Sequence, residues 1–348
     1  MAPQALHRQI EKSGTGQSSH QVHDEDVTAA AMDFLNRVGV RKRSGQQGEP
    51  FCLHVGYMLP HSPYVARESD FEIYRGEMAM PRNPGATDDR SHPFFQWWRD
   101  RNGFLDVKET DALRARTAYW ALVTRMDKMI GDILQSLDTN GLTENTMVLY
   151  SSDHGEQVGE KALWMKRTFY EDSVRVPAIL SWPGKLPAGQ VCHRVIGSLD
   201  LNATMLDALQ APALSHSHGR SLLGLLQNED PNWEDVAFSE YCLNEGHYHR
   251  MIRSGDWKLC YYHGQDSQLF NLAEDPEELQ NRAADPGCQD VLVDLTARVL
   301  EGWDPEWVIR KMEEKRDNLD MIRNWVSETE PADQFRWEVT PGMNYLDP

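Results

Sequence analysis

A long apolar stripe that leads directly into a buried strand constrains the fold most strongly. The stripe predicts a helix over residues 111–138, and Asn140-Gly141 ends this helix with a left-handed cap. The apolar segment 146–152 follows at once and predicts a buried strand. Helix, short turn and strand in this order are typical of a doubly wound α/β sheet. The stripe has the 3.6-residue period of one helix face and consists of Tyr119, Leu122, Val123, Met126, Ile130, Ile133, Leu134 and Leu137.

Further apolar segments extend this pattern. Residues 50–58 and 176–182 predict two more buried strands, and residues 198–211 predict a further helix. From residue 236 onward, short strand-like segments alternate with turn residues, which indicates a small antiparallel sheet. We therefore expect an α/β fold with a mainly parallel central sheet flanked by helices, followed by a small C-terminal antiparallel sheet with a helix.

The sequence predicts four regions. Residues 1–26 are rich in Gln, Ser, Gly and His and predict a flexible lead. Residues 27–235 form the predicted α/β domain and residues 236–326 a small α+β subdomain. Residues 327–348 predict an extended tail with aromatic anchors, and this tail allows a homo-oligomer.

Charge and composition limit the partners. The net charge of −19, from 54 acidic against 35 basic residues, argues against nucleic acid, whose phosphates need clustered Lys and Arg. An anionic substrate would need a local cation. No apolar segment is long enough for a membrane helix, and the lead has no signal-peptide core. We expect a cytoplasmic protein that contacts no membrane and whose five cysteines are free core thiols.

Asp153 and His154 follow the strand over 146–152 directly. Ligands bind at the carboxyl ends of strands in open α/β sheets. A carboxylate and an imidazole can both bind a divalent cation, so the two residues are candidate metal ligands. The alternative is a loop aspartate that caps a turn beside a surface histidine.

Two further residues are candidates for anion binding. Lys166 lies between Trp164 and Phe169, which indicates a partly buried ammonium group that could bind an anion. His61 follows a predicted strand between two prolines and is a candidate general acid or sulfate ligand. The alternatives are an exposed lysine and a turn histidine. We interpret His20 and His23 as solvated loop residues.

Five motifs in a fixed order resemble the sulfatase family of the alkaline-phosphatase-like superfamily. They are Pro-His-x-Pro at 60–63, the long helix and strand ending in Asp-His-Gly-Glu at 153–156, Leu-Trp-x-Lys at 163–166, Arg-Val-Pro at 175–177, and Leu-Phe-Asn-Leu with Asp-Pro-x-Glu at 269–278. The resemblance covers roughly residues 27–286. Within the family, Asp-His at 153–154 is similar to choline-sulfatases and phosphonate monoester hydrolases.

The resemblance implies a role for each candidate. Asp153 and His154 would be metal ligands for a divalent cation, with Ca²⁺ preferred over Mg²⁺ or Mn²⁺. Lys166 would bind a sulfate oxygen. His61 would contact the sulfate group and could protonate the leaving oxygen. The implied substrate is a small sulfated, or alternatively phosphorylated, organic molecule.

One family motif has no counterpart in this sequence. Sulfatases carry Cys-x-Pro/Ala-x-Arg, whose cysteine is converted to the formylglycine nucleophile, and two further metal-binding carboxylates near the N-terminus. None of the five cysteines has that context. We therefore expect a truncated sulfatase that is inactive as this chain stands. The alternatives are a phosphonate monoester or phosphodiester hydrolase, and a non-catalytic binding or assembly subunit.

Overall fold

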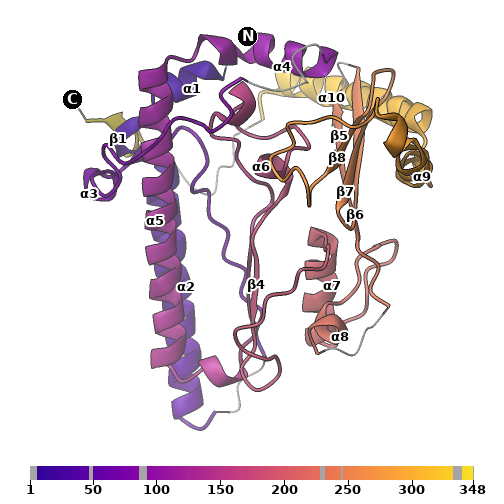
Figure 1. The fold of residues 1–348 in the computed structure, drawn as a ribbon. Helices are drawn as coiled ribbons and strands as arrows, with labels where there is room; N and C mark the ends of the chain where they lie inside the picture. The colour runs from indigo at the N-terminus through magenta and orange to yellow at the C-terminus, as the bar shows by residue number, and fades with distance from the viewer. Residues whose placement is uncertain are drawn as a thin grey trace.

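The computed structural model describes residues 6–46, 50–85, 92–227, 232–243, 246–331 and 339–347. Figure 1 shows a mixed α/β chain. The α-helices are α1 (His7–Glu11), α2 (Ser19–Arg43), α3 (Glu68–Phe71), α4 (Pro93–Asn102), α5 (Glu109–Thr139), α6 (Glu171–Val174), α7 (Ser198–Ala208), α8 (Leu223–Leu226), α9 (Gln289–Leu300) and α10 (Pro305–Thr329). The strands are β1 (Gly14–Gln17), β2 (Val65–Ala66), β3 (Val148–Ser151), β4 (Ala178–Ser181), β5 (Val236–Leu243), β6 (His247–Ser254), β7 (Trp257–Tyr262), β8 (Gln268–Asn271) and β9 (Tyr345–Leu346).

The predicted long helix is confirmed as α5, and Gly141 follows it with a left-handed φ of 66°. Helix α2 packs along α5, and the β3–β4 ribbon stands between this helix pair and α7 (Figure 1). The apolar stripe of α5 lies only partly in the core. Leu122 is buried, whereas Leu134 is 43% exposed. The stripe therefore faces a partly open space beside β3.

The α/β class is confirmed, but the mainly parallel central sheet is not present among the described residues. Strand β3 pairs with β4 in antiparallel register, with Val148 opposite Ser181. Strand β4 is also not buried as predicted, because Ile179 is 61% exposed. Among the described residues, β3 and β4 pair only with each other, so neither outer edge is joined to a parallel strand.

The predicted buried strand over 50–58 is not formed. The backbone there is extended, and the side chains of Phe51, Leu53, Val55 and Tyr57 are half-buried while those between them are exposed. This alternation has the period of a strand with one buried face. No strand among the described residues pairs with this segment. The segment therefore has the alternating exposure of a strand but forms no hydrogen-bonded ladder with another strand of the described residues.

The predicted C-terminal antiparallel sheet is confirmed. Its strands follow the order β5-β6-β7-β8, and each neighbouring pair is antiparallel. Helix α9 covers one face, where Leu295 and Val299 pack against Leu259 and Leu269. Sheet and helix share one apolar layer, as expected for an α+β unit.

The prediction of a flexible lead over 1–26 is wrong for the part that the structure describes. Residues 6–26 form α1, β1 and the first turns of α2, and Ile10 is completely buried. Strand β1 pairs in parallel with β2 and antiparallel with β9. Long-range pairing of this kind cannot be read from local composition. Residues 1–5 lie outside the described residues.

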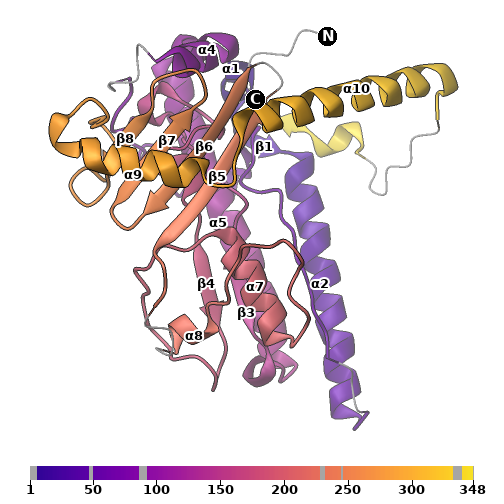
Figure 2. The same ribbon diagram turned by 90° about the vertical axis from the view of Figure 1, so that its right-hand side faces the viewer.

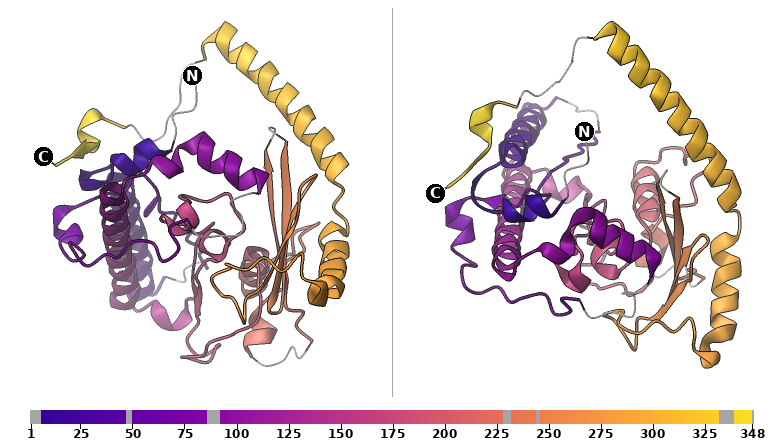
Figure 3. Two further views of the ribbon diagram at one scale, coloured as in Figure 1. Left: turned by 45° about the horizontal axis from the view of Figure 1, so that its top comes forward. Right: turned by 90° about the horizontal axis from the view of Figure 1, so that it is seen from above.

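The predicted extended tail begins inside a helix, because α10 continues to Thr329. Helix α10 has no buried residue, and Figures 2 and 3 show it as a rod along the outside of the molecule. Met321, Ile322 and Trp325 are exposed on it. The homo-oligomer through this region stays a prediction that the mass in solution would test. Residues 332–338 lie outside the described residues.

All five cysteines are free. The prediction of core thiols holds for Cys260, which is buried, and is wrong for Cys52 and Cys192, which are exposed. Cys52 is exposed because it lies on the outer side of the unpaired 50–58 segment. Within the described part of the chain, no helix is long and apolar enough to cross a membrane.

Candidate functional site

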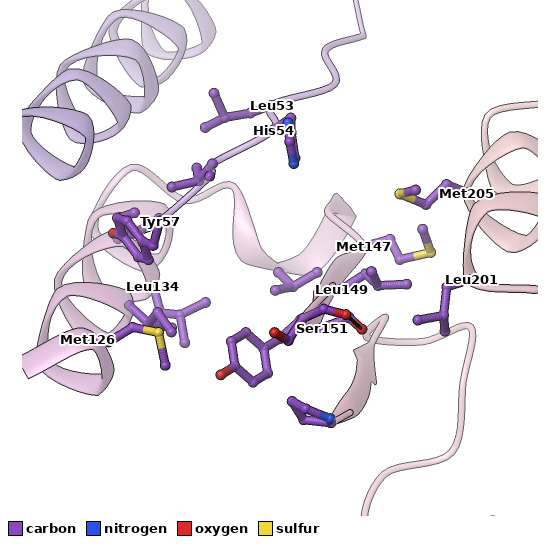
Figure 4. A pocket seen from close by; sticks show the side chains of 18 of the residues that line it. Leu53, His54, Tyr57, Met126, Leu134, Met147, Leu149, Ser151, Leu201 and Met205 are labelled. Atoms are coloured by element: carbon purple, nitrogen blue, oxygen red, sulfur yellow. Dashed lines mark hydrogen bonds between the residues drawn. The ribbon is translucent and has the colours of Figure 1, made fainter. Parts of the chain in front are cut away.

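A cavity of about 2670 Å³ lies around β3, and three of the four candidate residues line it. Figure 4 shows Met126 and Leu134 of α5 on one side of β3, and Leu201 and Met205 of α7 on the other. His61, Asp153 and His154 all line this cavity. Small-molecule pockets measure roughly 300–1,000 Å³. The apolar body of the cavity is therefore much larger than one small substrate requires.

Asp153 and His154 lie at the carboxyl end of β3, as predicted. His154 Nδ1 lies 2.8 Å from the Gly155 carbonyl and donates to it, so in the neutral form of the ring Nε2 carries the lone pair. That atom lies 3.4 Å from Asp153 Oδ2. The Asp153 side chain is 84% exposed. His154 Nε2 and Asp153 Oδ2 therefore lie close enough together for one cation to bind both.

His61 and Lys166 are in direct contact. Lys166 Nζ lies 2.9 Å from His61 Nε2. The Nδ1 of His61 lies 2.6 Å from the Ser62 carbonyl and donates to it. In this tautomer, His61 Nε2 accepts a hydrogen bond from Lys166 Nζ. Residues that are far apart in sequence therefore form one hydrogen-bonded pair beside Asp153 and His154, in which Lys166 carries the positive charge.

The charges of these groups influence one another. Partial burial lowers the pKa of His61, and the nearby Lys166, His20 and His154 lower it further. Burial also lowers the pKa of Lys166, while Glu156 and Asp153 act in the opposite direction. The site therefore favours a neutral imidazole beside the lysine. An entering anion would favour the protonated forms of both groups.

Glu156 fixes the loop that carries Lys166. Its carboxylate accepts the Met165 N–H at 2.5 Å and the Val158 N–H at 3.2 Å. Burial raises the pKa of Glu156. The same loop has left-handed φ values at Val158 and Met165, where a side chain is disfavoured. Its conformation is therefore set by these hydrogen bonds and by the packing around them rather than by backbone preference.

The prediction that His20 and His23 are solvated loop residues is wrong. Both lie in α2, and the ring centroid of His20 is 5.7 Å from that of His61. Burial lowers the pKa of His20. The sequence contained one signal for this, because Ser18 is a favourable N-cap and its hydroxyl accepts the Gln21 N–H. A helix that begins at Ser19 places His20 in its first turn.

The metal prediction can be compared with the donor atoms that are present. The hydrogen bond from His154 Nδ1 to a backbone carbonyl is typical of a metal-binding histidine. However, a hard cation takes six or more oxygen ligands. Among the described residues, no group of three or more His, Cys, Asp or Glu side chains could hold a metal ion. Asp153 could supply an oxygen to such a shell and His154 a nitrogen donor beside it, and the two do not complete it.

Comparison with known proteins gives a consistent family signal. The family model described as Sulfatase matches residues 2–211. A second model, described as N-sulphoglucosamine sulphohydrolase, C-terminal, matches residues 159–303. A choline-sulfatase from Rhizobium meliloti (strain 1021) is 30% identical over 284 residues, which cover 79% of this chain and 54% of the relative. The chain thus spans about half the length of the curated relatives that it matches.

Solved structures give the same result for the fold. A phosphonate monoester hydrolase from Silicibacter pomeroyi matches with a TM-score of 0.67 and 26% identity, over 78% of this chain and 59% of that one. A protein in complex with its substrate D-glucosamine-2-N,6-O-disulfate matches with a TM-score of 0.66 and 20% identity, over 80% of this chain and 69% of that one. The second match supports the fold alone.

Proposed function

The chain belongs to the sulfatase family, and from this membership we propose that His61 and Lys166 bind the sulfate group of a small organic sulfate ester. The observation that carries the proposal is the 2.9 Å contact between Lys166 Nζ and His61 Nε2, because His61 lines the same cavity as Asp153 and His154. Family membership supports sulfuric ester hydrolysis as the reaction to which this site contributes.

The two residues have different tasks in this proposal. Lys166 supplies a compact positive charge for a sulfate oxygen. To protonate the leaving oxygen, His61 must first take up a proton at Nε2, which partial burial and the Lys166 charge oppose by lowering its pKa. A bound anion would offset that effect by favouring the charged imidazolium. Substrate binding would therefore prepare His61 for its role as an acid.

We also propose that Asp153 and His154 contribute to a divalent cation site, with Ca²⁺ preferred. Sulfatases generally use a divalent metal. Oxygen-rich shells suit Ca²⁺, and the exposed Asp153 carboxylate has room for a large ion. Such a cation would supply additional positive charge for the sulfate ester. The remaining ligands would have to come from groups outside this pair.

The proposal assigns sulfate binding to this chain but not the hydrolysis of sulfate esters. The Cys-x-Pro/Ala-x-Arg motif that provides the family's nucleophile does not occur in the 348 residues. Without a nucleophile no covalent sulfo-enzyme can form. We expect this chain to bind inorganic sulfate and to leave aryl sulfates unhydrolysed. Turnover by the purified chain that disappears in His61→Ala would contradict this expectation.

Replacing Lys166 by Ala should weaken sulfate binding by roughly 10- to 100-fold, because a hydrogen bond to a charged group contributes about 1.5–3 kcal/mol. Calorimetric titration with sodium sulfate measures this directly. Lys185→Ala is the matched control, since Lys185 is an exposed lysine in a turn. Equal affinities for the wild type and Lys166→Ala would refute the role of Lys166.

Divalent cations should bind weakly, and Asp153→Asn should remove that binding, because the amide lacks the carboxylate charge. Titration with CaCl₂ and MgCl₂ in a calorimeter tests both the site and the order of preference. Asp132→Asn serves as the control, because Asp132 is exposed on α5. Tight binding that Asp153→Asn leaves unchanged would show that the ion binds elsewhere.

The similarity to a phosphonate monoester hydrolase at 26% identity favours a second candidate function. In that case the same residues would bind a phosphonate or phosphate group. Parallel titrations with sodium sulfate and phenylphosphonate distinguish the two candidates by their affinity ratio. A chain that binds neither anion would favour the non-catalytic binding or assembly subunit.

A further inference from the structure

The first half of α2 holds the backbone segment that precedes His61. Asp24 is completely buried, and its Oδ2 accepts the Met58 N–H at 2.9 Å and the Leu59 N–H at 2.8 Å. Its Oδ1 lies 2.8 Å from His23 Nδ1. A buried carboxylate with several N–H partners is strongly fixed in place. The backbone two residues before His61 is therefore attached to α2.

Two neighbouring contacts attach the same loop on either side of His61. Thr28 Oγ1 lies 2.7 Å from the Tyr57 hydroxyl, which precedes His61. Gln21 Nε2 donates to the Val65 carbonyl, which follows it. Residues three and four apart in sequence lie on one face of a helix, as Gln21, Asp24 and Thr28 do. One helix face thus binds the loop before and after His61.

The His61 ring itself also touches this helix. The His20 ring packs edge-on against it, with an interplanar angle of 71°. His20 lies one turn before Asp24 on α2. The two nitrogens of the His61 ring contact the Ser62 carbonyl and Lys166 Nζ. The position of the imidazole is therefore determined jointly by α2 and by the Lys166 loop.

We propose that Asp24 is a positioning residue that sets the His61 imidazole against Lys166. No strand pairing holds residues 57–63 among the described residues, so side-chain bonds hold this stretch: those from α2 before His61, and the Ser62 bond to Gln9 after it. Replacing the carboxylate by an amide removes the negative charge and one of the two acceptor oxygens that bind the Met58 and Leu59 N–H groups, and it would loosen the loop. The inference rests on the proposed function of His61 and Lys166. The NMR signals of the His61 ring, which test it, report the ring position whether or not sulfate binds.

Asp24→Asn should weaken sulfate binding by ~10-fold, the lower end of the effect of outer-shell partners on a site. It should also move or broaden the NMR signals of the His61 ring in histidine-labelled chain. Both are measured where circular dichroism shows the variant fully folded. The matched control is Asp33→Asn, an exposed carboxylate on the same helix whose partner is Arg37. This control should change neither readout.

A second variant keeps the test decisive if Asp24→Asn does not fold. Thr28→Val removes the bond to the Tyr57 hydroxyl while keeping the side-chain shape, and it should shift the His61 signals in the same direction by less. Unchanged His61 signals in a folded Asp24→Asn, or in Thr28→Val when it alone folds, overturn the inference. Absence of sulfate binding by the wild type defeats the proposed function, whereas the NMR signals still judge the role of Asp24.

Discussion

Replacing Lys258 by Met should lower the free energy of unfolding by about 3–5 kcal/mol, the cost of breaking a buried ion pair. The Lys258 side chain is completely buried and forms an ion pair with Glu278. Its Nζ also donates to Glu171 at 2.9 Å and to the Phe169 carbonyl at 2.7 Å. Burial alone would lower the pKa of Lys258, but the two carboxylates outweigh it and raise the pKa. Without the ammonium group, the buried Glu278 carboxylate loses its cation and remains near the partly buried Glu171.

Chemical denaturation of wild type and variant gives the difference. Lys311→Met is the matched control, because the Lys311–Glu314 pair is exposed and should contribute less than about 1 kcal/mol. Burial raises the pKa of Glu278. The variant can relieve its charge by protonating Glu278, so its deficit should grow as pH rises above the ordinary glutamate range and shrink in acid. A deficit below about 1 kcal/mol at neutral pH would contradict the buried pair.

Acid should destabilise the chain through His249 by about 3 kcal/mol between about pH 7 and about pH 4. His249 is 1% exposed, and neither ring nitrogen has a hydrogen-bond partner among the described residues. Its ring packs 4.7 Å from those of Phe94 and Tyr262. Burial, followed by the nearby His247, lowers its pKa to about 3. The native ring stays neutral, whereas the unfolded ring accepts a proton below about pH 6.5, so stability is lost as pH falls.

The variant His249→Phe should remove this part of the acid dependence, because Phe fills the site without a titratable group. Unfolding free energies measured across this pH range provide the test. His216→Phe is the matched control, since His216 lies in an exposed loop and should leave the pH dependence as in the wild type. An acid slope that is identical in wild type and His249→Phe would show that other groups cause the acid loss.

The sequence alone predicted the elements whose pattern is local. The stripe over 111–138 predicted α5 because a helix face repeats every 3.6 residues, whatever it packs against. The alternation of turns and apolar residues after 236 predicted the β5–β8 sheet for a similar reason. The direction of β3 against β4 and the missing ladder at 50–58 could not be predicted, because pairing depends on which strand lies alongside.

The residues of the candidate site could likewise be predicted from local motifs, whereas their contacts could not. The motifs identified His61, Asp153, His154 and Lys166, and the structure brings His61 and Lys166 within hydrogen-bond distance. Their roles stay predictions that the titrations above test. No role for Glu156 could be predicted, although it lies in the Asp-His-Gly-Glu motif, because its partner is the backbone of Met165 and not a neighbour in sequence.

What the sequence determined by itself is the long helix α5, the helix α7, the C-terminal sheet with its helix, and the identity of the candidate side chains. These follow from residue type and spacing along the chain. Only the tertiary structure decided that Asp24 holds the His61 loop and that Lys258 pairs with Glu278. Both contacts join distant segments, and a buried charge acquires its partner only when the packed chain excludes water from it.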